Sequence, residues 1–129
     1  RDMENDSVFM GRRDKGHKDK ESVVRSEFIE NVTAILDEIQ QGLFDRALER
    51  REASTVTIDD RDAFYTHFEG DGNGFVYAHF CGDPAVEEEI KADLKVTLRC
   101  IPMHGHDEEG TCIFTGKPSQ QRVLWAKSY

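Results

Sequence analysis

The chain has 129 residues, of which 37% are apolar and 33% are charged, and its formal net charge is −9. This length suits one ordinary domain or two small ones, and no apolar run approaches the roughly 20 residues that a membrane-spanning helix needs. The acidic balance repels phosphate, so we expect the chain alone to bind nucleic acid weakly. Its three cysteines cannot all pair with one another, which favours a reducing compartment over a disulfide framework.

The first part of the chain predicts a strand followed by a long helix. Residues 6–13 include consecutive apolar side chains and predict a strand, whereas the mixed charges of residues 14–21 predict a turn. Across residues 28–48, apolar side chains recur at steps of three and four, which predicts an amphipathic helix with Ser26 as its N-cap. The chain opens on Arg1 without a Met, so we expect it to be a fragment of a longer protein.

The second part predicts a small α/β (α+β) domain with a mixed sheet, and we place the domain boundary between residues 53 and 54. Asp59 is expected to cap a short helix over residues 60–69, and a second helix is expected over residues 85–94. Apolar alternation predicts strands over residues 75–81, 97–101, 111–114 and 122–126. The predicted fold is therefore a small mixed-sheet domain preceded by a strand and a long helix.

Cys81 stands before a Gly-Asp-Pro turn, as a cysteine does at the start of a zinc knuckle. A structural zinc site uses four soft donors, usually as two close pairs, and no two cysteines of this chain stand that close. Val86 occupies a place where a partner of Cys81 would stand, and Phe114 or Thr115 occupies the corresponding place after Cys112. We therefore favour buried free cysteines over a metal site.

Three histidines are the other candidate donors. His104 and His106 lie in a polar loop and would have to replace the missing thiolates, and the sequence leaves open whether they or His79 do so. His79 also stands two residues before Cys81, so the two side chains would share one face of a strand. That spacing suggests a cysteine-based enzyme as a weaker hypothesis, because no third orienting group is evident.

Charged residues gather in two further places. Residues 87–89 are three consecutive glutamates near the start of a predicted helix, where carboxylates favour the helix dipole, and we interpret them as a solvated face. Arg12, Arg13 and Lys15 cluster near the start of the chain and are candidate phosphate contacts. The acidic residues interleaved with them favour the alternative, a solvated hairpin.

A set of segments in a fixed order runs through the whole chain. They are RDMEN…VFMGRRDKG, ILDEIQQGLFDRA, FCGD…EEEIK, TLRCIP, CIFTGKP and VLWAKSY. Together they resemble prolyl-tRNA synthetases of the archaeal/eukaryotic-like type. By this resemblance, residues 1–53 are the last strand and last helix of the anticodon-binding domain, and residues 54–129 are the C-terminal domain, which carries a zinc site in many members.

The resemblance also implies what the candidate metal positions are. Cys81 and Cys112 correspond to the first members of two ligand pairs. Their second members are replaced by Val86 and by Phe114 or Thr115. With two of four thiolates gone, we expect no metal and no zinc in this chain.

The resemblance implies that the full-length protein is a cytoplasmic proline–tRNA ligase, a homodimer that uses ATP with Mg²⁺ to attach proline to tRNA(Pro). This chain lacks the class II catalytic core, so we expect a non-catalytic accessory module without a cofactor, whose partners are the rest of the synthetase chain and, through it, tRNA(Pro). Arg12, Arg13 and Lys15 become candidate tRNA contacts, and Tyr129 a candidate support of the active site. The alternative is a free-standing acidic domain that binds a protein partner.

Overall fold

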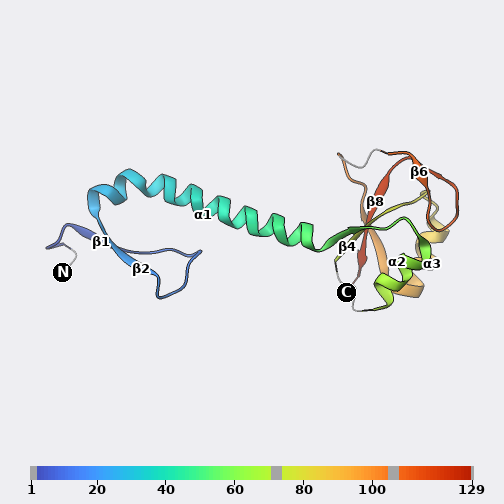
Figure 1. The fold of residues 1–129 in the computed structure, drawn as a ribbon, viewed down its shortest axis with the longest axis horizontal. Coiled ribbons are helices and arrows are strands. Elements are labelled where there is room, and N and C mark those ends of the chain that lie inside the picture. Colours follow the sequence, from blue (N-terminus) through green and yellow to red (C-terminus); the bar gives the residue numbers. More distant parts are fainter. Residues whose placement is uncertain (1–2, 71–73, 105–107, 129) are drawn as a thin grey trace. The chain divides into compact units, whose positions relative to one another are not determined.

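The computed structural model describes residues 3–70, 74–104 and 108–128. The chain divides into two compact units, Arg1–Arg51 and Glu52–Tyr129, whose elements are drawn in Figure 1. In the described part of the chain, no helix is both long and apolar enough to cross a membrane.

The first unit opens with a β-hairpin. Strand β1 (Ser7–Gly11) pairs antiparallel with strand β2 (Lys20–Val24) along the full length of both strands. The tip of the hairpin turns at Gly16, whose amide donates to the Asp19 carboxylate at 3.0 Å. The sequence predicted β1 but not β2, because β2 is charged, mostly exposed and begins inside the segment that was expected to be a turn.

Helix α1 (Arg25–Ala53) has 29 residues and confirms the helix that the apolar periodicity predicts. It begins one residue before the expected N-cap, Ser26, and the Arg25 amide donates to the Asp6 carbonyl at 2.9 Å. Its apolar stripe is only half-buried, and no described residue of α1 is fully buried. Amphipathic helices usually depend on a packed apolar face for their stability, and the described residues of this unit do not supply a full one.

The second unit is built on a mixed four-stranded sheet, which confirms the predicted fold class. The strand order is β3 (Thr55–Thr57), β4 (Phe75–His79), β8 (Arg122–Lys127) and β5 (Val96–Cys100). Strand β3 runs parallel to β4, whereas β8 is antiparallel to both of its neighbours. Figure 1 shows β4 and β8 side by side in this unit. Strand β3 was not predicted, because its three residues are too few to show a pattern.

Two helices begin at aspartate caps. Helix α2 (Arg61–Glu69) is capped by Asp60, whose carboxylate accepts from the Ala63 amide at 2.8 Å, so the expectation that Asp59 is the cap was wrong by one residue. Helix α3 (Pro84–Leu94) is capped by Asp83 and confirms the second predicted helix. A proline suits the first helical position because the amide it lacks would have no partner there.

The remaining strands form a short hairpin of their own. Strands β6 (Gly110–Thr111) and β7 (Pro118–Ser119) pair antiparallel outside the main sheet. The expected strand over residues 111–114 was therefore wrong beyond Thr111. Cys112 and the residues after it form a turn, because the chain must reverse to return to β7.

An aromatic cluster fills the core of the second unit. Phe64, Phe68 and Trp125 are at most 1% exposed, and Phe80 and Phe114 complete the cluster. The Phe64 ring centroid lies 4.9 Å from that of Phe68, 5.1 Å from that of Phe114 and 5.8 Å from that of Trp125, all edge to face. Edge-to-face pairs add stability beyond the area that they bury.

This cluster predicts that two phenylalanine substitutions differ strongly in their effect on the free energy of unfolding. Phe64→Ala removes a ring that is 0% exposed, and we expect a loss of about 3–5 kcal/mol in the free energy of unfolding. The matched control, Phe75→Ala, removes a ring that is 36% exposed and should cost clearly less. Urea unfolding followed by the fluorescence of Trp125, the single tryptophan, measures both. Equal losses in the two variants would contradict this assignment of the core.

Candidate functional site

Two tight turns carry two of the three cysteines. Cys81 follows the end of β4, and the next residue, Gly82, has a φ of 79°, which glycine adopts without strain. Cys112 follows β6, and its amide donates to the Lys117 carbonyl at 2.9 Å. The Gly116 amide donates back to the Cys112 carbonyl, also at 2.9 Å, and closes the second turn.

The two turns lie side by side. The Ile113 amide donates to the His79 carbonyl at 3.2 Å, which joins the second turn to the end of β4. The Thr115 hydroxyl donates to the Cys81 sulfur at 3.5 Å, and the same hydroxyl hydrogen-bonds the Cys112 sulfur. Because it has a single proton, the hydroxyl serves one sulfur at a time. The fold thus brings Cys81 and Cys112 together.

The surroundings of Cys112 favour its thiolate form. Burial raises the pKa of the Cys112 thiol, because the residue is 1% exposed. Hydrogen bonds from the Thr115 hydroxyl and from the amides of Phe114, Thr115 and Cys81 outweigh burial and leave the pKa of Cys112 below its ordinary value. A sulfur ringed by donors in this way suits a ligand or an attacking thiolate.

Lys117 adds a positive charge beside the two sulfurs. Its ammonium nitrogen lies 3.1 Å from the Asp83 carboxylate. Asp83 is the main cause of the raised pKa of Lys117, with smaller contributions from Cys81 and Cys112, and Lys117 lowers the pKa of Asp83. The stabilising contribution of Asp83 is therefore lost as the pH falls through its lowered pKa, and that of Lys117 as the pH rises through its raised pKa.

This set of donors does not fit a structural zinc ion. Thr115, rather than Phe114, stands beside both sulfurs, so a hydroxyl faces them. Val86 is half-buried against the core and lines a small pocket of about 110 Å³ together with Thr115. Structural zinc uses four thiolate or imidazole ligands. Over residues 3–70, 74–104 and 108–128, no three His, Cys, Asp or Glu side chains converge as a metal site would require.

The histidines do not supply the missing donors within the described residues. His79 is 5% exposed, and its Nδ1 lies 3.1 Å from the Ser119 hydroxyl. His104 is exposed in the loop after β5. His106 and Tyr129 lie outside the described residues, so the roles that the sequence suggested for them stay predictions.

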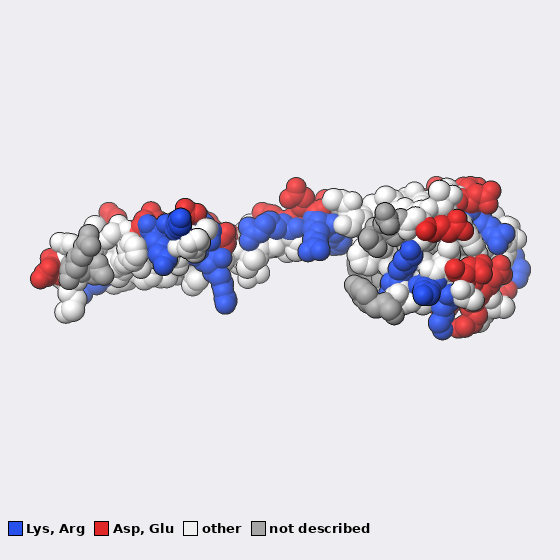
Figure 2. Space-filling model, turned by 90° about the horizontal axis from the view of Figure 1, so that it is seen from below, with Lys and Arg blue, Asp and Glu red and all other residues white. Residues whose placement is uncertain are grey.

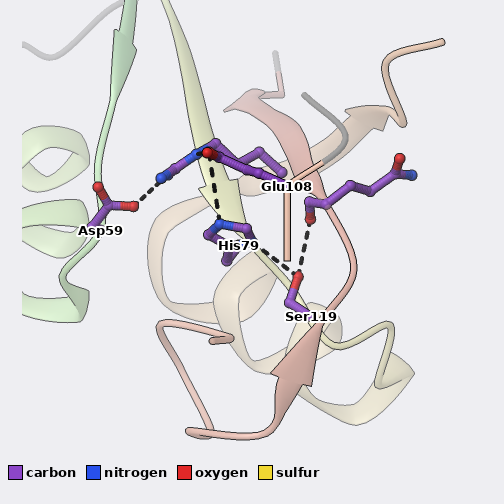
Figure 3. A network of polar contacts seen from close by, with 6 residues as sticks. Asp59, His79, Glu108 and Ser119 are labelled. Carbon is purple, nitrogen blue, oxygen red and sulfur yellow. Dashed lines mark hydrogen bonds and ion pairs between the residues drawn. The ribbon is translucent and has the colours of Figure 1, made fainter. Parts of the chain in front are cut away.

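His79 instead belongs to a polar network, drawn in Figure 3, in which His79 and Ser119 are buried while Glu108 and Asp59 reach the surface. The Ser119 hydroxyl donates to the Gln121 carbonyl at 3.0 Å, so it accepts from the His79 Nδ1–H group. On the other side of the ring, Nε2 lies 3.9 Å from Glu108, whose carboxylate also pairs with Arg122. Sequence reasoning missed these partners, because they come from segments far apart in the chain and none has a motif around it.

Two further contacts belong to the same network. Arg122 also pairs with Asp59, the residue directly before the cap of α2. Gly110 packs against the His79 ring so closely that a Cβ atom there would lie 2.4 Å from Nε2. The contacts of His79 are thus with Ser119 and Glu108, whereas the sulfur of Cys81 contacts Thr115. This arrangement gives no support to a Cys–His catalytic pair.

The basic residues of the hairpin unit differ in whether their charges are paired within the chain or exposed to solvent. Arg12 has a side chain that is 12% exposed and pairs with Asp14 at 2.9 Å and with Glu38 of α1 at 2.8 Å. The hydrogen bonds that Arg12 donates to these two carboxylates raise the pKa of Arg12, and Arg12 lowers the pKa of Asp14. Arg13 and Lys15 are exposed.

A pocket lies next to Arg13. It has a volume of about 280 Å³, and its lining combines Arg13, Arg46 and Asp14 with the apolar side chains of Ile39 and Leu43. Figure 2 shows Lys and Arg side chains gathered along this unit, with Asp and Glu along its upper margin. Arg12 therefore braces the hairpin against α1, while Arg13 offers a charge to solvent.

Comparison with known proteins gives one consistent result. The family described as "Prolyl-tRNA synthetase, C-terminal" matches residues 61–129. Proline--tRNA ligase 2 of Anaeromyxobacter dehalogenans is 50% identical over 140 residues, which cover 100% of this chain and 27% of that protein. Proline--tRNA ligase of Bdellovibrio bacteriovorus is 44% identical over 132 residues, which cover 100% of this chain and 26% of that protein.

A solved structure agrees with these relatives. Prolyl-tRNA synthetase from Cryptosporidium parvum, in complex with halofuginone and AMPPNP, superposes with a TM-score of 0.80 at 28% identity. The match covers 99% of this chain and 27% of that one, so the chain spans about a quarter of the length of its relatives. The family match covers more than half of the chain, and the chain therefore belongs to the prolyl-tRNA synthetase C-terminal family.

Proposed function

We propose that this chain is the C-terminal accessory part of a proline–tRNA ligase and carries no catalytic residue of its own. The observation behind the proposal is that relatives named proline--tRNA ligase match 100% of this chain, although it spans only 26–27% of them. In this proposal residues 1–53 end an anticodon-binding domain and residues 54–129 form the C-terminal domain. The division into compact units near this point supports that assignment.

The chemistry belongs, in this proposal, to the part of the enzyme outside this chain. That part would activate proline with ATP and Mg²⁺, transfer it to tRNA(Pro) and pair with a second copy in the cytoplasm. The presence of AMPPNP, an analogue of ATP, in a related synthetase supports ATP as the nucleotide. The rest of the synthetase is then the first partner of this chain, and tRNA(Pro) reaches it through the complete enzyme.

Proline-dependent exchange of pyrophosphate into ATP tests the proposal. We expect no exchange from the isolated chain and full exchange from the complete protein that contains it, since adenylate formation needs the class II core. Exchange catalysed by the isolated chain would overturn the proposal. A reading frame without a class II core before Arg1 would instead favour a free-standing acidic domain.

The hairpin supplies the proposed contacts to tRNA. Arg13 and Lys15 are exposed, and no ion pair engages either of them among the described residues, so both can approach a phosphate. Arg12 is held by two carboxylates and would act by fixing the hairpin in place. The net charge of −9 opposes a polyanion, so these contacts should be weak without the rest of the enzyme.

In the complete enzyme, the double variant Arg13→Ala/Lys15→Ala should weaken tRNA binding and leave proline activation unchanged. Each lost phosphate contact should reduce the slope of log affinity against log salt by roughly 0.7–0.9. Lys91→Ala, which removes one charge from α3 in the other unit, is the control and should leave the slope unchanged. An unchanged slope in the double variant would exclude these two residues as phosphate contacts.

We also propose that the two cysteine turns hold no zinc. A four-ligand site supplies apparent binding free energies of about 10–16 kcal/mol, and replacing two thiolates by the apolar Val86 and the hydroxyl of Thr115 should remove most of it. The positive charge of Lys117 beside both sulfurs partly takes the place of the ion's charge.

The double variant Val86→Cys/Thr115→Cys should therefore gain a zinc ion. We expect about one zinc per chain that resists a chelator, with a raised melting temperature, because four thiolates then surround one position. The two single variants are the matched controls and should hold zinc weakly. Elemental analysis measures all four proteins, and a tightly held zinc in the parent chain would show that other donors, such as His104 or His106, complete its site.

A further inference from the structure

Two buried or half-buried thiols stand close together in this chain without an assigned task. Cys112 is buried and Cys81 is half-buried, and both are free. The described part of the chain provides no third soft donor beside them. The third cysteine, Cys100, is exposed at the end of β5, in a different part of the sheet.

Backbone hydrogen bonds hold the chain segments that carry Cys81 and Cys112 next to each other. The Ile113 amide donates to the His79 carbonyl at 3.2 Å, so the segments that lead into Cys81 and out of Cys112 run beside each other. The Cys81 amide also hydrogen-bonds the Cys112 sulfur. The Cβ atom of Cys81 is two covalent bonds from that amide nitrogen, which places it close to the Cys112 sulfur.

Side-chain contacts bring the sulfurs themselves together. The Thr115 hydroxyl lies 3.5 Å from the Cys81 sulfur and is also a hydrogen-bond partner of the Cys112 sulfur. Two atoms that share one partner are separated by at most about two hydrogen-bond lengths. A disulfide requires Cβ atoms about 3.8 Å apart, a spacing that the backbone sets. Rotation of the half-buried Cys81 side chain about χ1 is the movement that would bring its sulfur onto that of Cys112.

We propose that Cys81 and Cys112 are a redox-active pair that forms a reversible disulfide with a small-molecule disulfide, such as oxidised glutathione, as oxidant. The half-buried Cys81 meets the oxidant first: its thiolate attacks one sulfur, a mixed disulfide forms and one small thiolate leaves. The Cys112 thiolate then attacks the Cys81 sulfur and expels the second small thiolate. Two protein thiols lose two electrons, the oxidant gains them, and the two thiol protons end on the released thiols.

The surroundings assign different roles to the two sulfurs. Cys112 is 1% exposed, so a tripeptide disulfide cannot reach it, but the donors around its sulfur hold it ready to attack Cys81. Lys117 lies near both sulfurs. Cys100 is exposed and therefore reacts with the oxidant. It stands on β5, separated by β8 from the strand that leads to Cys81, so no second cysteine is near enough to release the small thiol.

Peptide mass spectrometry after treatment with oxidised glutathione and alkylation tests the proposal on the unmodified sequence. We expect a cross-linked peptide that contains Cys81 and Cys112, glutathione on Cys100, and reversal of both by dithiothreitol. In Cys112→Ser, Cys81 should keep its glutathione, whereas in Cys81→Ser, Cys112 should stay unmodified.

Absence of the Cys81–Cys112 peptide under conditions in which Cys100 is fully glutathionylated would overturn the proposal, and so would a cross-link from Cys100 to either of them. The readout is chemical and needs no enzyme activity. Its failure would therefore leave the proposed role in a proline–tRNA ligase untouched.

Discussion

Burial of Trp125 is the constraint on which the second unit depends. Its ring is 0% exposed and packs edge to face on Phe64 of α2, on Phe80 and on Phe114. Phe80 directly precedes Cys81, and Phe114 directly precedes Thr115. The aromatic cluster therefore anchors both cysteine turns through apolar contact, the task that metal–ligand bonds perform in a four-thiolate site.

Polar and charged groups of the chain itself surround the sulfurs at the two turns. A divalent ion normally neutralises the thiolates around it, whereas here the neighbours of the sulfurs are hydroxyl, amide and ammonium groups of the chain itself. Lys117 is held by Asp83, which also caps α3, so the cation is tied to the start of a helix. The two turns thus form a packed pair that hydrogen bonds of the chain itself hold together.

The sequence predicted those elements whose pattern is local and missed those that depend on distant partners. Helices α1 and α3 and the mixed sheet follow from apolar periodicity and turn residues. The sequence of strand β2 is exposed and charged, which does not indicate a strand. It forms a strand because it pairs with β1. At the site, spacing alone left Phe114 and Thr115 as alternatives, and only the fold shows that the aromatic ring turns into the core while the hydroxyl faces the sulfurs. The partners of His79 lie up to 40 positions away, beyond any spacing rule.

The contact between Gly110 and His79 constrains the order in which this protein can change during evolution. Any side chain at position 110 would overlap the imidazole, since a Cβ atom would lie 2.4–2.7 Å from three of its ring atoms. A smaller residue at position 79 removes that overlap but gives up the hydrogen bond to Ser119. Replacement of Gly110 is therefore disfavoured while His79 is present, so changes at position 110 should follow changes at position 79.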